Sequence, residues 1–512
     1  MLVKTFGSAL QGIDSMLITV EVSVGRGTGF SLVGLPDNAV KESNQRVFSA
    51  VWNSGFRYPR NKVVINMAPA DVKKEGSAYD LPIAVGILAA SEQISPDRLG
   101  DYLIMGELSL DGSLNPIKGA LPMALNAKKA GFKGFILPEI NAPEAAIVEG
   151  LSVYGFNNLK EVTEMLDGTL TPDEVKVDME ELFAHASNDY PFDFEDVKGQ
   201  ENIKRALEIA AAGGHNVIMI GPPGSGKTML AKRLPSILPP MTLEEALETT
   251  KIHSVSGVLS NDTALITSRP FRSPHHTISD AGLIGGGTFP QPGEISLAQN
   301  GVLFLDELPE FKRSVLEVMR QPMEDRVVTI ARAKMSVEYP AAFMLVSAMN
   351  PCPCGYYNHP EKACVCSPGV VKKYLNRISG PLMDRIDLHV EVIPVLVKDL
   401  TELPKGEPSK VIRERVIKAR IIQQARFANH DSVYSNSQMS RKDLEKYCSL
   451  SDEGRNLLKT AMEKLSLSAR AYDRILKVSR TIADLESSEN IEPQHLAEAI
   501  QYRSLDRESW GN

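Results

Sequence analysis

The sequence lacks the features that mark secreted and membrane-spanning proteins. It holds five cysteines, and four of them fall between Cys352 and Cys366, unlike the spread framework of a disulfide-stapled domain. The N-terminus, which begins Met1-Leu2-Val3-Lys4, shows no signal-peptide pattern. The longest apolar runs, such as Leu81 to Ala90, are far shorter than the about 20 residues that span a bilayer. We therefore expect a reduced, cytoplasmic protein that does not enter a membrane.

A surplus of positive charge is also missing. The net charge of −8 argues against a surface that is basic all over, although a motor can bind nucleic acid by confining its positive charge to a pore. There is no fixed-period repeat and no low-complexity tract. A chain of 512 residues, 43% of them hydrophobic, is too long for one core and should form about three domains.

Changes in residue pattern predict where these domains begin and end. Residues 1–168 alternate short β-branched runs with helical patterns, which is typical of an α/β or α+β domain. Residues 169–192 are polar, acidic and interrupted by prolines, as in a linker. We expect an α/β core over residues 193–395 and a helical domain over residues 396–512.

Local periodicity predicts individual elements within these domains. Strands are expected at Met16 to Val24 and Lys62 to Met67. Helices are expected at Ala39 to Ser54, Leu121 to Ala130, Lys410 to Ala428, Arg441 to Tyr447, Asp452 to Leu465, Ser468 to Leu485 and Pro493 to Tyr502.

A glycine-rich loop between a strand and a helix predicts a site for ATP. Val217 to Ile220 is typical of a buried parallel strand, and a helical pattern follows the loop. Backbone N–H groups of such a loop approach phosphates, Lys227 reaches the β- and γ-phosphates, and the Thr228 hydroxyl is suited to Mg²⁺. The predicted ATP-binding residues are Gly221, Pro222, Pro223, Gly224, Ser225, Gly226, Lys227, Thr228 and Met229.

Two further strands end in polar side chains that suit ATP hydrolysis. The apolar run from Gly301 ends in Asp306, which can hold Mg²⁺, and Glu307, which can polarise the attacking water. The run from Phe343 to Ala348 precedes Asn350, whose amide can orient the same water. We assign Lys227, Asp306, Glu307 and Asn350 to the catalytic site.

Several longer motifs resemble one family. Arg269 to His276, Pro292 to Ala298, Gly301 to Phe311 and Asn350 to Gly355 together resemble the magnesium-chelatase-like AAA+ family, in particular its ComM/YifB branch. The resemblance covers nearly the whole chain. It implies an α/β fold: a P-loop AAA+ core with a parallel sheet, an N-terminal S5-like α+β domain and a C-terminal helical lid. It also implies a homo-hexameric ring with ATP sites between subunits.

A site shared between subunits needs a cation from the neighbour. The segment Ser379 to Asp387 resembles the family segment that holds the arginine finger, which implies that role for Arg385, with Arg377 as a second choice. Ser468 to Tyr472 resembles the sensor-2 position, which implies that Arg470 touches the γ-phosphate. The alternative for each arginine is a surface salt bridge.

The clustered cysteines suggest a metal. Tetrahedral zinc favours four soft ligands, and the loop is long enough to fold back on itself. Four reduced cysteines on a turn-rich loop are the alternative, and His359 could replace one ligand. Cys448 is expected to be a lone buried thiol. The candidate zinc ligands are Cys352, Cys354, Cys364 and Cys366.

The N-terminal domain resembles the proteolytic domain of Lon without its catalytic dyad. The likeness is carried by Gly106 to Gly119. The serine position of Lon falls on Ala78, and its lysine position falls on Leu121 or Met123, neither of which can accept a proton. Ser77 is one residue away from the serine position. We expect a binding or ring-building domain.

A predicted hairpin offers a contact to DNA. Two β-rich halves flank a short basic centre between Val327 and Tyr339, and in AAA+ proteins with this insertion the tip points into the pore. There Arg332 and Lys334 could grip phosphates, although a solvated turn is the alternative. The basic stretch from Lys410 to Arg426 is more typical of a solvated helix face.

The resemblance makes a DNA motor the first hypothesis. The ComM branch is understood as a hexameric helicase that drives branch migration during natural transformation and recombination, which implies branched or single-stranded DNA as partner. A chelatase-type motor that remodels a protein partner is the second hypothesis, and a regulator of proteolysis is the third. The Lon-like domain favours the first hypothesis over the second, and the missing dyad weakens the third.

Overall fold

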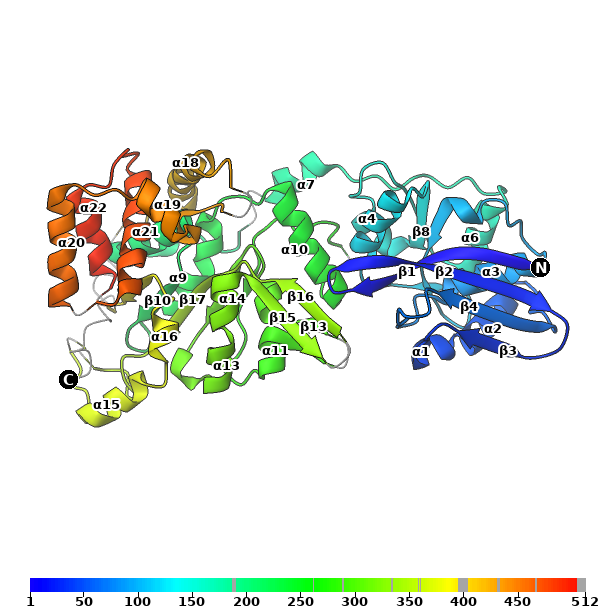
Figure 1. Cartoon of the computed structure of the whole chain (residues 1–512), viewed down its shortest axis with the longest axis horizontal. Coiled ribbons are helices and arrows are strands. Elements are labelled where there is room, and N and C mark those ends of the chain that lie inside the picture. Colours follow the sequence, from blue (N-terminus) through cyan, green and yellow to red (C-terminus); the bar gives the residue numbers. More distant parts are fainter. Residues whose placement is uncertain are drawn as a thin grey trace. The chain divides into compact units, whose positions relative to one another are not determined.

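The chain forms two compact units in the computed structural model (Figure 1). The first unit contains Met1–Ala186 and Leu243–Thr267, and the second contains Ser187–Thr242 and Ser268–Asn512, so the polypeptide crosses between them three times. The three boundaries expected from the sequence, after residues 168, 192 and 395, remain predictions. The structure describes residues 1–186, 190–260, 262–287, 290–332, 335–357, 359, 361–394, 404–430, 433–465 and 467–503.

A mixed seven-stranded sheet forms the centre of the first unit. Its order is β3-β4-β2-β1-β5-β8-β9, and β1 and β2 form an antiparallel hairpin in which Leu2 faces Ser23. A short ribbon of β6 and β7 lies outside this sheet. The strands are β1 (Leu2–Gln11), β2 (Asp14–Gly25), β3 (Phe30–Val33), β4 (Lys62–Ala68), β5 (Tyr102–Ile104), β6 (Glu107–Leu108), β7 (Leu114–Asn115), β8 (Gly134–Pro138) and β9 (Ser152–Phe156).

Helix α3 (Asp80–Ala90) is the centre of this unit's core. Every one of its residues is buried, because its apolar side chains pack on β1 and β2. Gly86 permits this approach, since a Cβ there would lie 2.6 Å from Val22 Cγ2. The other helices before residue 187 are α1 (Asn38–Lys41), α2 (Ser43–Asn53), α4 (Ala120–Ala130), α5 (Ala142–Ala145), α6 (Leu159–Leu166) and α7 (Met179–Ala186).

Helix α10 (Leu243–Ser256) joins the first unit although it follows the glycine-rich loop in sequence. Leu247 packs against the core of that unit, and Lys251 pairs with Asp14 at 3.3 Å. The hydroxyl of Ser254 donates to the buried carboxylate of Glu144, and burial raises the pKa of that carboxyl. A segment inside the expected α/β core therefore completes the N-terminal unit.

A parallel five-stranded sheet forms the centre of the second unit. Its order is β11-β14-β17-β10-β18, and all its neighbouring strands run parallel. The two inner neighbours β10 and β17 are buried along their whole length, as in sheets covered on both faces. The strands are β10 (Val217–Ile220), β11 (Phe271–Arg272), β14 (Val302–Leu305), β17 (Met344–Met349) and β18 (Leu388–Glu391).

Two antiparallel ribbons and several short helices surround this sheet. The ribbons are β12 (Gly285–Gly286) with β13 (Gln291–Pro292), and β15 (Val327–Arg332) with β16 (Met335–Pro340). The helices are α8 (Glu201–Gly213), α9 (Lys227–Arg233), α11 (Asp280–Ile284), α12 (Glu294–Leu297), α13 (Arg313–Val318), α14 (Arg320–Asp325), α15 (Pro368–Leu375) and α16 (Gly380–Met383).

The last part of the chain is helical. Helix α21 buries one face against α8 and α22, and the Ser468 hydroxyl caps its first turn by accepting the N–H of Ala471. A capping box between Ser440 and Asp443 starts α19. The helices are α18 (Ser409–Arg426), α19 (Arg441–Tyr447), α20 (Asp452–Lys464), α21 (Ala469–Leu485) and α22 (Pro493–Gln501).

The structure confirms the expected fold class and most expected elements. The expectation of one helix from Ala39 to Ser54 is wrong in one respect: Glu42, at ψ −12°, interrupts it and separates α1 from α2. The linker is not wholly irregular either, because Asp178 accepts the N–H groups of Glu180 and Glu181 and so starts α7. Within the described residues, no helix is long and apolar enough to cross a bilayer.

Candidate nucleotide site

The glycine-rich loop turns directly from β10 into α9. Gly224 and Gly226 have φ of 79° and 89°, a left-handed conformation that residues with a Cβ rarely adopt. Gly221 leaves no room for a side chain, since a Cβ there would lie 2.3 Å from the carbonyl oxygen of Val392. The loop therefore turns sharply and lies against the backbone that follows β18, and a sharp glycine turn of this kind directs N–H groups toward a phosphate.

Lys227 lies inside this loop. Its Nζ donates to the carbonyl oxygens of Gly221 and Pro222 at 2.7 and 2.9 Å. Burial lowers the pKa of Lys227, and the carboxylates of Asp306 and Glu307 oppose this effect. The ammonium group is thus held at the loop and close to the acidic pair after β14.

The structure brings the two predicted magnesium ligands together. The Thr228 hydroxyl donates to Asp306 Oδ2 at 2.6 Å. The other carboxylate oxygen of Asp306 accepts the backbone N–H of Glu307 at 2.9 Å, which fixes the orientation of the carboxylate. A hydroxyl and a carboxylate at this spacing are oxygen ligands of the kind that Mg²⁺ prefers.

Asn350 lies beside the same lysine. Its Oδ1 is 3.3 Å from Lys227 Nζ, and the preceding Met349 accepts the backbone N–H of Gly221 at 3.2 Å. Because β10, β14 and β17 are parallel neighbours, the residues that follow each strand meet at one edge of the sheet. This edge can therefore bind a phosphate chain, a divalent cation and a water molecule together.

Two contacts at this edge involve residues that the sequence did not assign. Glu307 adopts a left-handed conformation with φ of 53°, and its Oε2 lies 3.4 Å from Nδ1 of His276. Gln200 donates from Nε2 to the carbonyl oxygen of Ser225 inside the loop at 2.9 Å. His276 belongs to a motif used only for the family resemblance, and Gln200 carried no sequence signal.

The same family motifs also contact one another. Nε and Nη2 of Arg272 each lie 2.7 Å from a carboxylate oxygen of Glu294, so the two side chains form a bidentate pair. Arg272 belongs to β11 and Glu294 opens α12, so the pair ties the edge strand to the segment before β14. This pairing has a structural role in holding the sheet edge.

Arg385 is buried and paired within its own chain. Its Nη2 lies 2.7 Å from Glu324 Oε1, its Nη1 donates to the carbonyl oxygen of Pro381, and its side chain is 7% exposed. Arg377 is 52% exposed and lies 3.0 Å from Glu310. The second-choice arginine is thus the more accessible of the two.

Arg470 lies next to the proposed finger segment. It pairs with Asp384 at 3.3 Å, and no hydrogen bond or ion pair joins it to the phosphate loop in the described part of the chain. One helical turn later, Arg474 pairs with the buried Asp387 at 3.2 Å. Two ion pairs therefore connect helix α21 to the segment that contains Arg385.

Asp387 also forms the centre of a buried polar cluster. Its Oδ2 is 3.1 Å from His215 Nδ1, and His215 Nε2 is 2.8 Å from the Thr481 hydroxyl. Burial favours the neutral carboxyl, but Arg474 and His215 outweigh it and hold the pKa of Asp387 well below its usual range. Burial lowers the pKa of His215, which keeps its ring neutral near pH 7.

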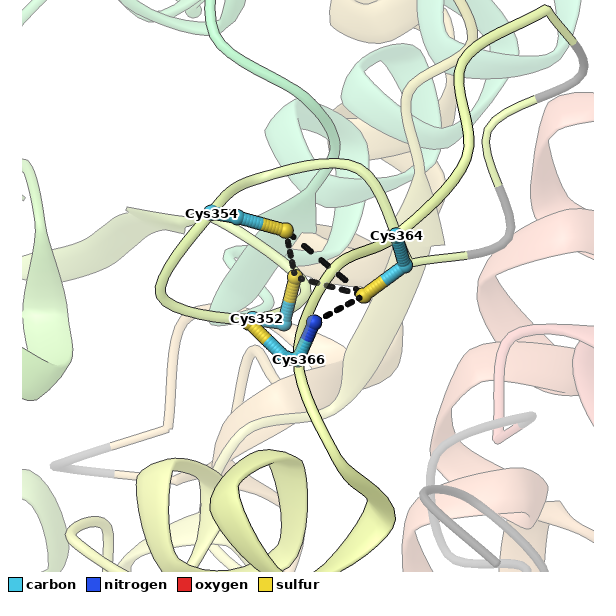
Figure 2. A group of neighbouring side chains, drawn as sticks. All are labelled: Cys352, Cys354, Cys364 and Cys366. Carbon is cyan, nitrogen blue, oxygen red and sulfur yellow. Dashed lines mark hydrogen bonds between the residues drawn. The ribbon is translucent and has the colours of Figure 1, made fainter.

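The four clustered cysteines point their sulfurs at one another (Figure 2). The Sγ atom of Cys352 lies 3.3 Å from that of Cys354 and 3.7 Å from that of Cys364, and the last two are 3.6 Å apart. With Cys366 included, all four sulfurs lie within 4.8 Å of one another. All four are free thiols, so this group could bind zinc.

The two other candidates for this chemistry lie apart from the group. The ring Nδ1 of His359 accepts the backbone N–H groups of Glu361 and Lys362, so it serves the loop's own backbone. Cys448 is a lone buried thiol as expected, and burial raises its pKa to about 12.

The DNA contacts predicted from the sequence belong to the segment between β15 and β16. The hairpin itself is confirmed, with Val327 opposite Pro340. Lys334 and the side chain of Arg332 fall outside the described residues. On helix α18, Arg415 pairs with Glu208 and Glu407, and Arg426 pairs with Asp484.

The Lon-like positions in the first unit carry no nucleophile–lysine pair. Leu121 and Met123 are buried in the core, and Ala78 packs against it. The hydroxyl of Ser77 donates to Glu107, and Lys74 donates to the carbonyl oxygen of Pro69.

Comparison with known proteins agrees with this geometry. Protein-family models described as magnesium chelatase, subunit ChlI, match residues 193–400 and 20–141. A third family model, for the C-terminal part of that subunit, matches residues 406–503. Competence protein ComM of Haemophilus influenzae is 45% identical over 507 residues, covering 98% of this chain and 97% of that protein. The uncharacterized protein YifB of Escherichia coli is 44% identical over 504 residues, covering 98% and 96%.

A partial similarity concerns a protease. Lon protease 2 of Bacillus subtilis is 35% identical over 162 residues, which cover 29% of this chain and 28% of that protein. The two near-full-length matches and the chelatase models settle the wider relationship. The chain belongs to the magnesium-chelatase-like AAA+ ATPases of the ComM/YifB family.

Proposed function

We propose that this chain hydrolyses ATP as one subunit of a hexameric ring that moves along DNA in the cytoplasm. The observation that carries the proposal is the meeting of Lys227, Thr228 and Asp306 at one edge of the parallel sheet. Lys227 and the loop N–H groups bind the phosphates. Mg²⁺ held by Thr228 and Asp306 would neutralise charge on the β- and γ-phosphates.

Glu307 and Asn350 act on the attacking water. Glu307 accepts its proton as general base, and the amide of Asn350 orients it. His276, at 3.4 Å from Glu307, positions that carboxylate between turnovers. Glu307 and Asn350 follow the ends of adjacent strands, so both can reach one water molecule.

A neighbouring subunit completes the site in this proposal. Arg385 stabilises the transferred phosphoryl group in trans, which requires its pair with Glu324 to open on ring closure. Arg377 is the second choice, and Arg470 acts as the sensor arginine after release from Asp384.

DNA is the substrate of the motor in this proposal, and Arg332 and Lys334 contact its phosphates. The supporting observations are the hairpin and the similarity to competence protein ComM. We propose helicase activity that promotes branch migration during natural transformation and recombination. The alternatives are a chelatase-type motor that remodels a protein partner and a regulator of proteolysis.

The four cysteines hold a structural zinc ion in this proposal. Zinc–sulfur bonds of about 2.3 Å in a tetrahedron place the sulfurs about 3.8 Å apart. Two observed separations, 3.6 and 3.7 Å, are close to that edge length, the third is 3.3 Å, and all four sulfurs lie within 4.8 Å of one another. Thiolates are also the ligands that zinc prefers.

A junction assay tests the DNA function. The full chain with ATP should convert a labelled Holliday junction to duplex products, and DNA should stimulate its ATPase. Lys227→Ala should abolish both activities, whereas Lys232→Ala, an exposed lysine on the same helix, should change neither. ATP hydrolysis without DNA stimulation or junction processing would reject the helicase and leave the ATPase standing.

A further inference from the structure

The cysteine loop contacts the phosphate loop directly. Gly355, which follows Cys354, adopts a left-handed φ of 83°. A Cβ added there would lie 2.6 Å from Pro223 Cδ and 3.2 Å from its Cγ, so the backbone at Gly355 lies against the proline ring of the phosphate loop. Gly355 is buried, like Cys352 before it, whereas the other described residues of the loop are half-buried or exposed.

The strand before the cysteine loop contacts the same element. Met349, at the end of β17, accepts the N–H of Gly221, and Asn350 lies at Lys227. The stretch from residue 349 to residue 355 therefore touches the beginning, the middle and the end of the phosphate loop. Any shift of this stretch must change the shape of the ATP site.

A backbone hydrogen bond holds the turn that contains Gly355. Its N–H donates to the carbonyl oxygen of Cys352 at 2.9 Å, which closes the turn between the first two cysteines. On the other side of the loop, Val365, between the second two cysteines, is 85% exposed. A loop of this kind has much conformational entropy to lose, and a four-thiolate metal site is a strong way to fix it.

We propose that metal at the four cysteines braces the phosphate loop, so that ATP binding depends on metal occupancy. This inference rests on the proposed zinc site. When the metal is bound, Cys352 and Cys354 fix the turn, and Gly355 supports Pro223 in the position that suits the phosphates. When the metal is lost, the turn relaxes and the phosphate loop loses that support.

Metal removal tests the proposal on the full chain. Purified protein should contain about one zinc per chain by elemental analysis. A strong chelator under reducing conditions should weaken binding of a fluorescent ATP analogue about tenfold, and added zinc should restore it. Cys364→Ser with Cys366→Ser should behave like the chelated protein, while Cys448→Ser should keep both zinc and affinity.

The possible outcomes distinguish the zinc site from its effect on ATP binding. A chain with no zinc that also fails to bind added zinc overturns the metal site and this inference, but leaves the ATPase proposal intact. A chain that loses zinc and keeps its nucleotide affinity within about twofold overturns the brace alone. Circular dichroism of each sample shows whether the fold survives metal loss.

A backbone substitution tests the contact without touching a ligand. Gly355→Ala should retain zinc and weaken binding of the fluorescent ATP analogue about tenfold, because its Cβ would displace Pro223. Gly131→Ala is the matched control, since its φ of 84° gives the same backbone strain and no atom lies within 4 Å of a Cβ added there. Equal affinities of the two variants would show that the contact does not transmit to the nucleotide.

Discussion

The two units differ in the kind of side chain at the positions where a catalytic group would lie. At the edge of the parallel sheet, Lys227, Asp306 and Asn350 are polar and lie within reach of one another. At the Lon-like positions of the first unit, Leu121 and Met123 are buried in the hydrophobic core. Similarity to a protease thus does not by itself bring reactive groups to these positions, so function must be read from the site.

The units also differ in how they hold a buried aspartate. Asp80 in the first unit pairs with Arg46 at 2.6 Å, yet burial outweighs this partner and raises its pKa to about 6. Asp387 in the second unit faces Arg474 and His215, and its pKa is lowered despite complete burial. The number of cationic or hydrogen-bonding partners decides which way a buried carboxyl shifts.

The largest expected effect concerns catalysis in the second unit. Glu307→Gln removes the proposed general base and should lower the ATPase rate by about 10²–10⁴-fold while ATP binding persists. Steady-state phosphate release and fluorescent nucleotide binding measure the two properties. Glu414→Gln, on an exposed part of α18, is the control. A rate within about twofold of the native chain would show that Glu307 is not the base.

The next effect is on stability and tests the Asp387 cluster. Asp387→Asn leaves Arg474 without its buried counter-charge and should lower the free energy of unfolding by about 3 kcal/mol. Asp384→Asn, which breaks only the exposed pair with Arg470, should cost less than about 1 kcal/mol. Urea unfolding followed by circular dichroism compares them. Equal losses would mean that burial does not distinguish the two pairs.

In the first unit, the burial of Asp80 is expected to make the free energy of unfolding depend on pH. Because folding raises the pKa of Asp80 from 3.8 to about 6, the folded state binds its proton more tightly than the unfolded state does. This group therefore lowers stability as the pH rises from about 4 to about 6, by up to about 3 kcal/mol.

Urea unfolding at several pH values measures this dependence. Fluorescence of Trp52 reports on the first unit in a Trp510→Phe background. Asp80→Asn should remove the part of the slope between pH 4 and pH 6, while the exposed Asp173→Asn should keep it. An unchanged slope in Asp80→Asn would assign the dependence to another group.

The smallest effect is expected at Ser77. Its hydroxyl donates to Glu107 and not to a lysine, so Ser77→Ala should leave ATP hydrolysis within about twofold and casein uncleaved, as in the native chain. If the native chain cleaved casein and Ser77→Ala did not, the first unit would contain an active protease. The two units would then no longer differ in whether they hold a catalytic site.

The sequence predicts elements well where local signals define both ends. The strand Val217–Ile220 and the helix Arg441–Tyr447 have the expected bounds, since an apolar run meets a glycine loop in one and a capping box opens the other. The meeting of Thr228 and Asp306 also follows from strand order, because polar residues after parallel neighbours share one edge.

Contacts set by tertiary packing could not be predicted in this way. No local pattern shows that His276 lies at Glu307, or that Arg470 pairs with Asp384. The sequence likewise does not predict that Leu243–Thr267 belongs to the first unit, because the helical period of this segment would be the same in either core. The N-cap at Asp178, by contrast, was a local signal within the expected linker.

The three crossings of the chain have a consequence for synthesis. The first unit needs helix α10, whose Ser254 satisfies the buried Glu144, and that helix is encoded after β10 and the phosphate loop. A ribosome adds about 5–20 residues per second, so the N-terminal unit waits several seconds for its last piece after residue 186 has been made. The first unit to be started is therefore finished only when the ATPase is already partly built.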